Sequence, residues 1–219
     1  MALNNLKFNQ NEFIVSTTKP FNNIFEFLVA IILSQNTSDK NAIRAFNRLR
    51  TVCPVTPQSI LETQIEILEN AIMPAGLYKV RACTLKKLAK IVIEKYDGKL
   101  EFINKMDWRQ ARKVLLNLPG VGEKTADVLL AFLGKPVFPV DTHIRRLVTR
   151  LGLVKRDNYE EISSVLKKIF KPEEYLMVHL KMISYGRRVC KARKPQCDKC
   201  SLNDICHYFK SLAKQQLKG

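Results

Sequence analysis

Apolar residues recur along this chain at the spacings of helices. Nearly every residue from Phe21 to Leu33 is apolar, which predicts a helix that is buried on all sides. The stretch from Asp39 to Arg50 is amphipathic and basic, so a second helix is expected there. Similar patterns predict one short helix within residues 54–70 and a basic helix that opens after Ala75 and runs to Tyr96. No stretch of useful length alternates as a strand does, so the sequence predicts an all-α fold.

A glycine hairpin joins two helical patterns in the middle of the chain. Residues 109–116 are typical of one helix, the sequence LPGVGEKTA follows at 118–126, and apolar residues from Ala126 to Leu133 resume the helical spacing. Gly120 and Gly122 allow a tight turn and a close approach of the backbone to a ligand. The exposed N–H groups of such a hairpin, and of the helix after it, suit a phosphate.

Lys124 lies in the first turn of the second helix, where the helix dipole disfavours an ammonium group. That helix should end near Gly134, after about 16 Å. Residues 135–140 can then run back for about 20 Å as extended chain. They would bring Asp141, a good N-cap for the next helix, near Lys124. An amine and a carboxylate beside a phosphate-binding hairpin form a candidate active site, whereas the hairpin alone would also fit an ordinary turn with a solvated lysine.

Two more helices are predicted before the cysteine-rich end of the chain. Asp157 is expected to cap a helix that ends near Phe170. Pro172, followed by two glutamates, is typical of a first helical turn, and this helix should run to about Arg188.

The charge of the chain points to a polyanionic partner. Among 219 residues, 37 are lysine or arginine and 20 are acidic, which gives a formal net charge of +17. No apolar run is long enough for a membrane span, so no membrane partner is expected. The first residues lack the pattern of a secretory signal. We therefore expect an intracellular protein, not a secreted one, whose cysteines are more often metal ligands or buried thiols than disulfides.

Four cysteines near the end of the chain have the spacing C-x6-C-x2-C-x5-C, and four thiolates can close one metal site. Zinc and a [4Fe–4S] cluster both accept such a set, and the spacing by itself does not separate them. The four are Cys190, Cys197, Cys200 and Cys206. The loop between the first two carries Lys191, Arg193 and Lys194, which predicts contacts to phosphates of the polyanionic partner, with a solvated basic tail as the alternative.

The run LPGVGEKTADVLLAFLGKPVFPVDTHIRRLVTR, residues 118–150, closely resembles the endonuclease III branch of the helix-hairpin-helix DNA glycosylases. The resemblance extends from about Phe25 to Cys206 and includes the cysteine spacing, which in this family holds a [4Fe–4S] cluster. It implies a two-lobed helical fold with the DNA cleft between the lobes. Residues 20–136 would form a helical barrel, and residues 1–19 with 137–219 would form the cluster lobe.

The resemblance also implies an activity. Lys124 would attack the sugar C1′ as a neutral amine and form a Schiff base, and Asp141 would stabilise positive charge on the sugar or assist deprotonation of the nucleophile. The damaged base must leave the duplex to reach this pair. Leu77 resembles the family's apolar wedge. Asn36 aligns with the wedge glutamine of bacterial members, while Gln35 stands one residue earlier, so both amides are candidates for the space of the flipped base.

The implied function is base-excision repair, with release of a damaged base, expected to be an oxidised pyrimidine, and β-elimination at the abasic site. The partner would be double-stranded DNA with damaged bases or abasic sites, bound by a monomer. The expected DNA contacts are Gln35, Asn36, Leu77, Gly120, Val121, Gly122, Thr125, His143, Lys191, Arg193 and Lys194. Two alternatives remain: removal of thymine or uracil mispaired with guanine, and a helix-hairpin-helix module that binds DNA without chemistry.

Overall fold

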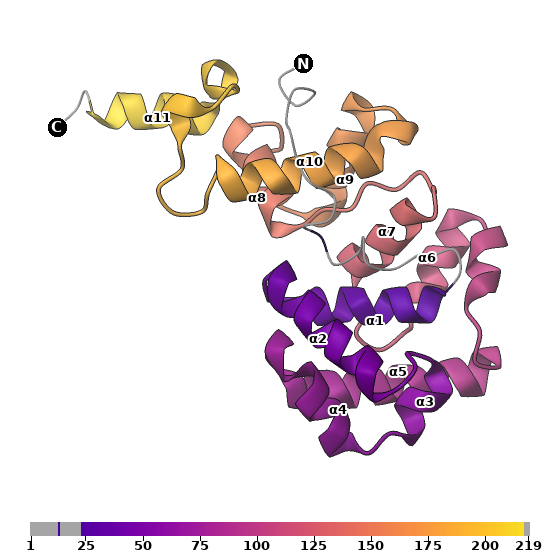
Figure 1. Cartoon of the computed structure of the whole chain (residues 1–219). Coiled ribbons are helices and arrows are strands. Elements are labelled where there is room, and N and C mark those ends of the chain that lie inside the picture. The colour runs from indigo at the N-terminus through magenta and orange to yellow at the C-terminus, as the bar shows by residue number, and fades with distance from the viewer. Residues whose placement is uncertain (1–12, 14–22, 217–219) are drawn as a thin grey trace. The chain divides into compact units, whose positions relative to one another are not determined.

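The structure is a computed structural model and describes residue 13 and residues 23–216. Every regular element in this part of the chain is helical, which confirms the predicted all-α fold (Figure 1). None of the helices described there is long and apolar enough to cross a membrane. The α-helices are α1 (Ile24–Ser34), α2 (Asp39–Val52), α3 (Pro57–Glu62), α4 (Ile65–Ile72), α5 (Tyr78–Tyr96), α6 (Trp108–Leu116), α7 (Glu123–Phe132), α8 (Thr142–Leu151), α9 (Tyr159–Ile169), α10 (Tyr175–Arg188) and α11 (His207–Gln216).

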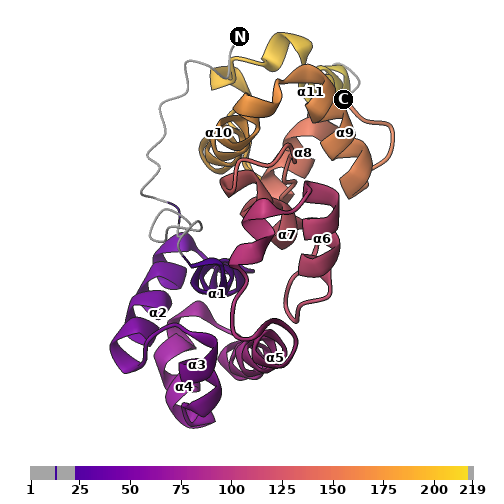
Figure 2. The same cartoon turned by 90° about the vertical axis from the view of Figure 1, so that its right-hand side faces the viewer.

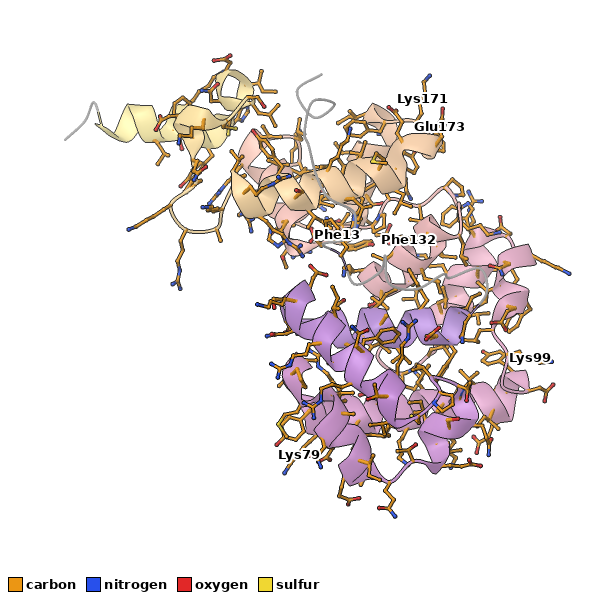
Figure 3. All side chains as sticks on the ribbon, viewed as in Figure 1. Phe13, Lys79, Lys99, Phe132, Lys171 and Glu173 are labelled. Atoms are coloured by element: carbon orange, nitrogen blue, oxygen red, sulfur yellow. The ribbon has the colours of Figure 1, made fainter. Side chains whose placement is uncertain are left out.

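The described residues divide into two compact units, one that ends at Lys135 and one that begins at Pro136. Apart from Phe13, the segment 1–19 that was expected to join the second lobe lies outside the described residues. Basic side chains project from both units into solvent, among them Lys79, Lys99 and Lys171 (Figure 3). Exposed basic side chains on both units agree with the net charge of +17, from which a polyanionic partner is expected.

Helix α1 forms the centre of the first unit, as its apolar sequence predicts. Its residues from Ile24 to Leu33 are buried except for Glu26. Helices α2, α5 and α7 pack against it (Figure 2). One of these contacts is aromatic, with the ring centroids of Phe27 and Phe132 5.2 Å apart. Because α7 follows the glycine hairpin, this packing fixes the hairpin to the core of the unit.

Two details of the predicted helices were wrong. Residues 54–70 form α3 and α4 instead of one helix, because Thr63 and the residue after it are extended. The N–H and the hydroxyl of Thr63 both donate to the Ser59 carbonyl, at 3.0 and 2.7 Å, and close the last turn of α3. The N-cap of α9 is Asn158, whose side chain accepts from the Glu161 N–H at 2.8 Å. Asp157 instead pairs with Arg145, at 3.2 Å.

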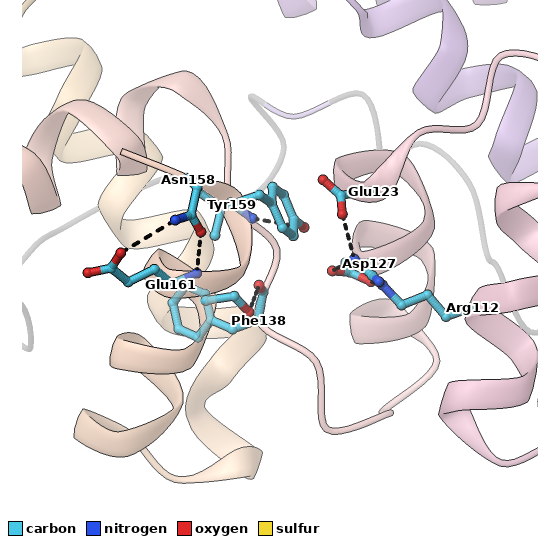
Figure 4. Close-up of polar contacts among 9 residues, drawn as sticks. Arg112, Glu123, Asp127, Phe138, Asn158, Tyr159 and Glu161 are labelled. Atoms are coloured by element: carbon cyan, nitrogen blue, oxygen red, sulfur yellow. Dashed lines mark hydrogen bonds and ion pairs between the residues drawn. The ribbon is translucent and has the colours of Figure 1, made fainter. Parts of the chain in front are cut away.

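The second unit holds the extended segment that leads to Asp141. The Phe138 side chain is fully buried, with its ring centroid 5.5 Å from that of Tyr175. Main-chain groups of the segment are paired as well: the Ser163 hydroxyl donates to the Phe138 carbonyl at 3.0 Å, and the Val140 N–H donates to the Tyr159 hydroxyl at 3.3 Å (Figure 4). Helices α9 and α10 therefore fix the chain just before it enters α8.

Candidate active site and cysteine cluster

The glycine hairpin lies tightly against the core of the first unit. Gly120 has a φ of 78°, and a Cβ at this position would lie 2.7 Å from the Thr84 methyl and 3.3 Å from the Ile32 Cδ1. Only glycine combines this backbone angle with this close approach. The Val121 side chain is buried, and its N–H donates within the turn to the Leu118 carbonyl at 3.2 Å. The main chain at Gly122, in contrast, is exposed, with open space where a side chain would be.

Lys124 lies half-buried in the first turn of α7. The helix begins after Gly122, which has no side chain to cap the first N–H groups. Arg112 of α6 pairs with Asp127 at 2.7 Å and with Glu123 at 3.5 Å, which ties the two helices of the motif together (Figure 4). The result is a helix N-terminus with donors suited to a phosphate and an amine beside them.

Gln35 and Asn36 follow α1 and differ in what they contact. The Gln35 side-chain amide donates to the Gly120 carbonyl at 2.9 Å and to the Thr125 hydroxyl at 3.2 Å. A carbonyl oxygen only accepts, so the amide nitrogen must face Gly120. Gln35 and the buried Thr125 are therefore bound to the hairpin, whereas Asn36 is exposed.

The backbone takes a left-handed conformation at three predicted DNA contacts. Among the described residues, four other than glycine have positive φ angles: Asn36 at 52°, Leu77 at 49°, Lys194 at 47° and Asp97 at 49°. Asp97 is the C-cap of α5. The Leu77 side chain is also 63% exposed. Strained, exposed residues concentrate at ligand-binding sites, so the backbone supports these three candidates independently of any motif.

Asp141 caps α8, as the sequence predicts. Its Oδ1 accepts from the Ile144 N–H at 2.8 Å, and its side chain is half-buried. His143 follows in the first turn and lies against Gly186 of α10, where a Cβ would meet the His143 Cβ at 2.8 Å. Arg146, one turn further, donates to the Gly186 carbonyl and to the His143 Nδ1, at 2.9 and 3.0 Å.

His143 is held in its neutral form by these surroundings. Burial lowers the pKa of His143 below its usual value, and the positive charges of Arg146 and Arg187 add to this against the opposing charge of Asp141. A guanidinium only donates, so Nδ1 accepts from Arg146 in the tautomer that carries its proton on Nε2. His143 can therefore offer an N–H donor to an anion at neutral pH.

The four cysteines of the motif surround one cavity in the second unit. They line it together with aliphatic side chains of α8 and the C-terminal segment. Within the described residues, no three histidine, cysteine or acidic side chains converge closely enough to hold a single ion. One zinc ion would draw its four sulfurs to about 3.8 Å from one another. Four thiols that line one cavity can each bind one iron of a [4Fe–4S] cluster.

The electrostatics of the cysteines also fit a cationic group. Burial raises the pKa of Cys197, and the other three cysteines raise it further. Four thiolates would repel one another here unless a positive group lay among them. Hydrogen bonds already reach two of the sulfurs: the Tyr185 hydroxyl donates to Cys200 Sγ at 3.0 Å, and Arg150 donates to Cys190 Sγ at 3.4 Å.

Arg150 holds the basic loop between the first two cysteines. Its guanidinium donates to the main-chain carbonyls of Lys191 and Ala192, at 2.7 and 3.1 Å, and lies over the Tyr208 ring. Lys191, Arg193 and Lys194 remain exposed. No sequence pattern marks Arg150, because a basic residue on a helix of a basic protein has no distinguishing signal.

Comparison with known protein families matches two parts of the chain. The model of the HhH-GPD superfamily of base excision DNA repair proteins matches residues 29–172, and that of the iron-sulfur binding domain of endonuclease III matches residues 190–206. Endonuclease III of Sulfolobus acidocaldarius is 39% identical over 207 residues, which cover 93% of this chain and 91% of the relative. Endonuclease III of Escherichia coli is 34% identical over 194 residues, 88% of either chain.

Solved structures with a similar fold include an endonuclease III and another DNA glycosylase. A trapped covalent intermediate of an endonuclease III with DNA matches with a TM-score of 0.77 and 36% identity, over 87% of this chain and 86% of that one. A thermostable thymine-DNA glycosylase matches with a TM-score of 0.79 over 95% and 92% of the two chains. At 23% identity, the second match shows a shared fold only.

Proposed function

The chain belongs to the endonuclease III family of base-excision repair proteins and is a DNA glycosylase and abasic-site lyase, and we propose that Lys124 and Asp141 carry this chemistry on oxidised pyrimidines. The observation that carries the proposal is the uncapped start of α7, with Lys124 in its first turn. A related endonuclease III has been trapped as a covalent intermediate with DNA, which supports an enzyme nucleophile.

Lys124, as the neutral amine, attacks C1′ of the damaged nucleoside while the glycosidic bond breaks and the base leaves with the bonding electrons. Loss of the amine proton and opening of the sugar give a Schiff base. Removal of a proton from C2′ then expels the 3′ phosphate, which cleaves the strand. Asp141 stabilises the positive charge that develops on the sugar or accepts a proton from the nucleophile.

DNA contacts come from both units. Asn36 fills the space of the extruded base, because it is exposed whereas the Gln35 amide is bound to the hairpin. Leu77 enters the base stack as an apolar wedge. The N–H groups at Gly122 and the start of α7 bind a phosphate. The lobes 20–136 and 137–219 would both contribute contacts to DNA, which would be bound by a single copy of the chain, inside the cell.

The chain carries a [4Fe–4S] cluster in the segment 190–206. Its proposed ligands are Cys190, Cys197, Cys200 and Cys206. When bound, the cluster cross-links these cysteines and so holds the loop between the first two in one shape. Lys191, Arg193 and Lys194 of that loop bind phosphates, while Arg150 fixes their main chain.

A panel of duplexes that each carry one lesion tests the substrate. Duplexes with an oxidised pyrimidine should release the base and be nicked, with higher kcat/KM than duplexes with thymine or uracil opposite guanine. Faster release from the mispairs would replace the oxidised-pyrimidine proposal by the mismatch alternative. Binding without base release or nicking on any duplex would contradict the catalytic proposal.

Replacement of Lys191, Arg193 and Lys194 by alanine should weaken DNA binding and flatten its salt dependence. Each phosphate contact contributes about 0.9 to the slope of log K against log salt, so three contacts account for up to about 2.7. Fluorescence anisotropy with an undamaged duplex at several salt concentrations measures this slope. The matched control replaces the exposed Lys155, Arg156 and Lys168, which removes the same charge from the same unit. Equal slopes for the two triple variants would show that the loop makes no specific phosphate contacts.

A further inference from the structure

Arg81 is a buried arginine that donates to main-chain carbonyls. It lies in the first turn of α5 and is 6% exposed. One terminal nitrogen of its guanidinium donates to the Ile32 carbonyl and the other to the Gln35 carbonyl, both at the end of α1. The last carbonyls of a helix have no partner within the helix, so Arg81 closes the end of α1.

Its contacts connect the segments that bind DNA in the first unit. The Leu77 carbonyl accepts from the main-chain N–H of Arg81 at 3.0 Å, one helical turn away. Gln35, whose carbonyl Arg81 holds, donates through its side chain to the Gly120 carbonyl at 2.9 Å. Asn36 is the next residue in the chain. Arg81 and Gln35 thus join the Leu77 turn, the Asn36 turn and the glycine hairpin.

The capping of α1 by Arg81 has costs in stability. The buried Nε of Arg81 has no hydrogen-bond partner, and an unsatisfied buried donor costs about 1–3 kcal/mol. Burial also lowers the Arg81 pKa, because the charged form is poorly solvated there. An apolar residue would avoid both penalties, although it would remove the donor to the Ile32 and Gln35 carbonyls. A guanidinium, however, is a rigid planar fork that holds two carbonyls at a fixed separation.

We propose that Arg81 is a positioning residue, which holds the Asn36 turn and the Leu77 turn in one arrangement so that both side chains enter the duplex together. The inference rests on the DNA contacts proposed above for Asn36 and Leu77. These side chains act when a paired base is extruded. An abasic site has no base to extrude, so strand cleavage at such a site depends much less on their arrangement.

The test compares two rates measured on one preparation of the full-length protein with its cluster. The first is single-turnover base release from a duplex with a paired oxidised pyrimidine, and the second is strand cleavage of the same duplex with a preformed abasic site. Arg81→Met should lower base release about 100-fold and strand cleavage less than about 3-fold, because a small misplacement of positioning groups suffices for a loss of this size. The ratio of the two rates is independent of the fraction of folded protein.

Lys86→Met is the matched control. Lys86 lies on the same helix and donates to the Leu61 carbonyl at 2.8 Å, away from the DNA-binding turns, so its loss should leave the ratio unchanged. Arg81→Lys should give an intermediate ratio, since an ammonium group is a point charge without the fork, and it carries the test if Arg81→Met does not fold. An unchanged ratio for both Arg81 variants would overturn the proposal.

Asn36→Gly and Leu77→Ala separate this inference from the function on which it rests. Each should lower base release more than strand cleavage. If neither does, the proposed wedges fail and the role of Arg81 fails with them. If both do while the Arg81 variants keep the wild-type ratio, the wedges stand and only the positioning role of Arg81 is wrong.

Discussion

Lys124→Gln is expected to abolish covalent capture of DNA by borohydride and to lower base release by at least about 10³-fold, a loss typical of enzymes deprived of their nucleophile. Glutamine cannot form a Schiff base. It is a good helix former, so α7 should remain intact. The contacts of Arg112 with Glu123 and Asp127 hold the start of this helix without Lys124. Gel analysis of reduced enzyme–DNA mixtures and single-turnover kinetics measure the two effects.

Lys113→Gln is the matched control for this prediction. Lys113 is exposed on α6, the other helix of the motif, and its replacement makes the same change in charge. It should trap DNA as the wild type does. Full trapping by Lys124→Gln, with the control unchanged, would show that another amine is the nucleophile.

Asp141→Asn is expected to lower base release by about 10²- to 10⁴-fold while DNA affinity and folding change little. Asparagine keeps the oxygen that accepts from the Ile144 N–H, so it remains a good N-cap for α8. The variant loses the carboxylate charge, and a negative charge at the N-terminus of a helix stabilises the fold by about 0.3–1 kcal/mol. Thermal unfolding, binding to lesion DNA and single-turnover base release together separate the chemical effect from a structural one.

Asp107→Asn provides the control for the cap itself. Asp107 caps α6, with its Oδ1 at 2.9 Å from the Arg109 N, and has no proposed part in the chemistry. Its loss of stability should resemble that of Asp141→Asn, with base release near the wild-type rate. Similar losses of base release in the two variants would assign the effect to the cap and not to the carboxylate.

The sequence predicted elements whose cause is local. Helix α1 follows from an apolar run interrupted only by Glu26, and the start of α8 follows from Asp141 as its N-cap. The break at Thr63 lies where the backbone leaves the helical conformation, which apolar spacing does not reveal. Asp157 and Asn158 are neighbours and are both suited to capping, so the sequence does not show that Asn158 is the N-cap of α9.

The candidate site was predictable where a motif marks it and unpredictable where tertiary contacts decide. The glycine spacing around Lys124 and the cysteine spacing are sequence patterns, so both could be found. Arg81 and Arg150 act on carbonyls 49 and 41 residues away, and their positions in the sequence resemble those of any surface arginine. The positive φ of Asn36 distinguishes this residue from Gln35. It is a property of the folded chain and is not visible in the sequence.

The most direct test of the central claim is to map the amine that becomes attached to DNA. Wild-type protein is reduced with borohydride during reaction with a duplex that carries one oxidised pyrimidine, and the adduct is digested and located by mass spectrometry. Attachment to Lys124 alone is the predicted result. Attachment at another amine, or base release and strand cleavage without any adduct, would contradict the account.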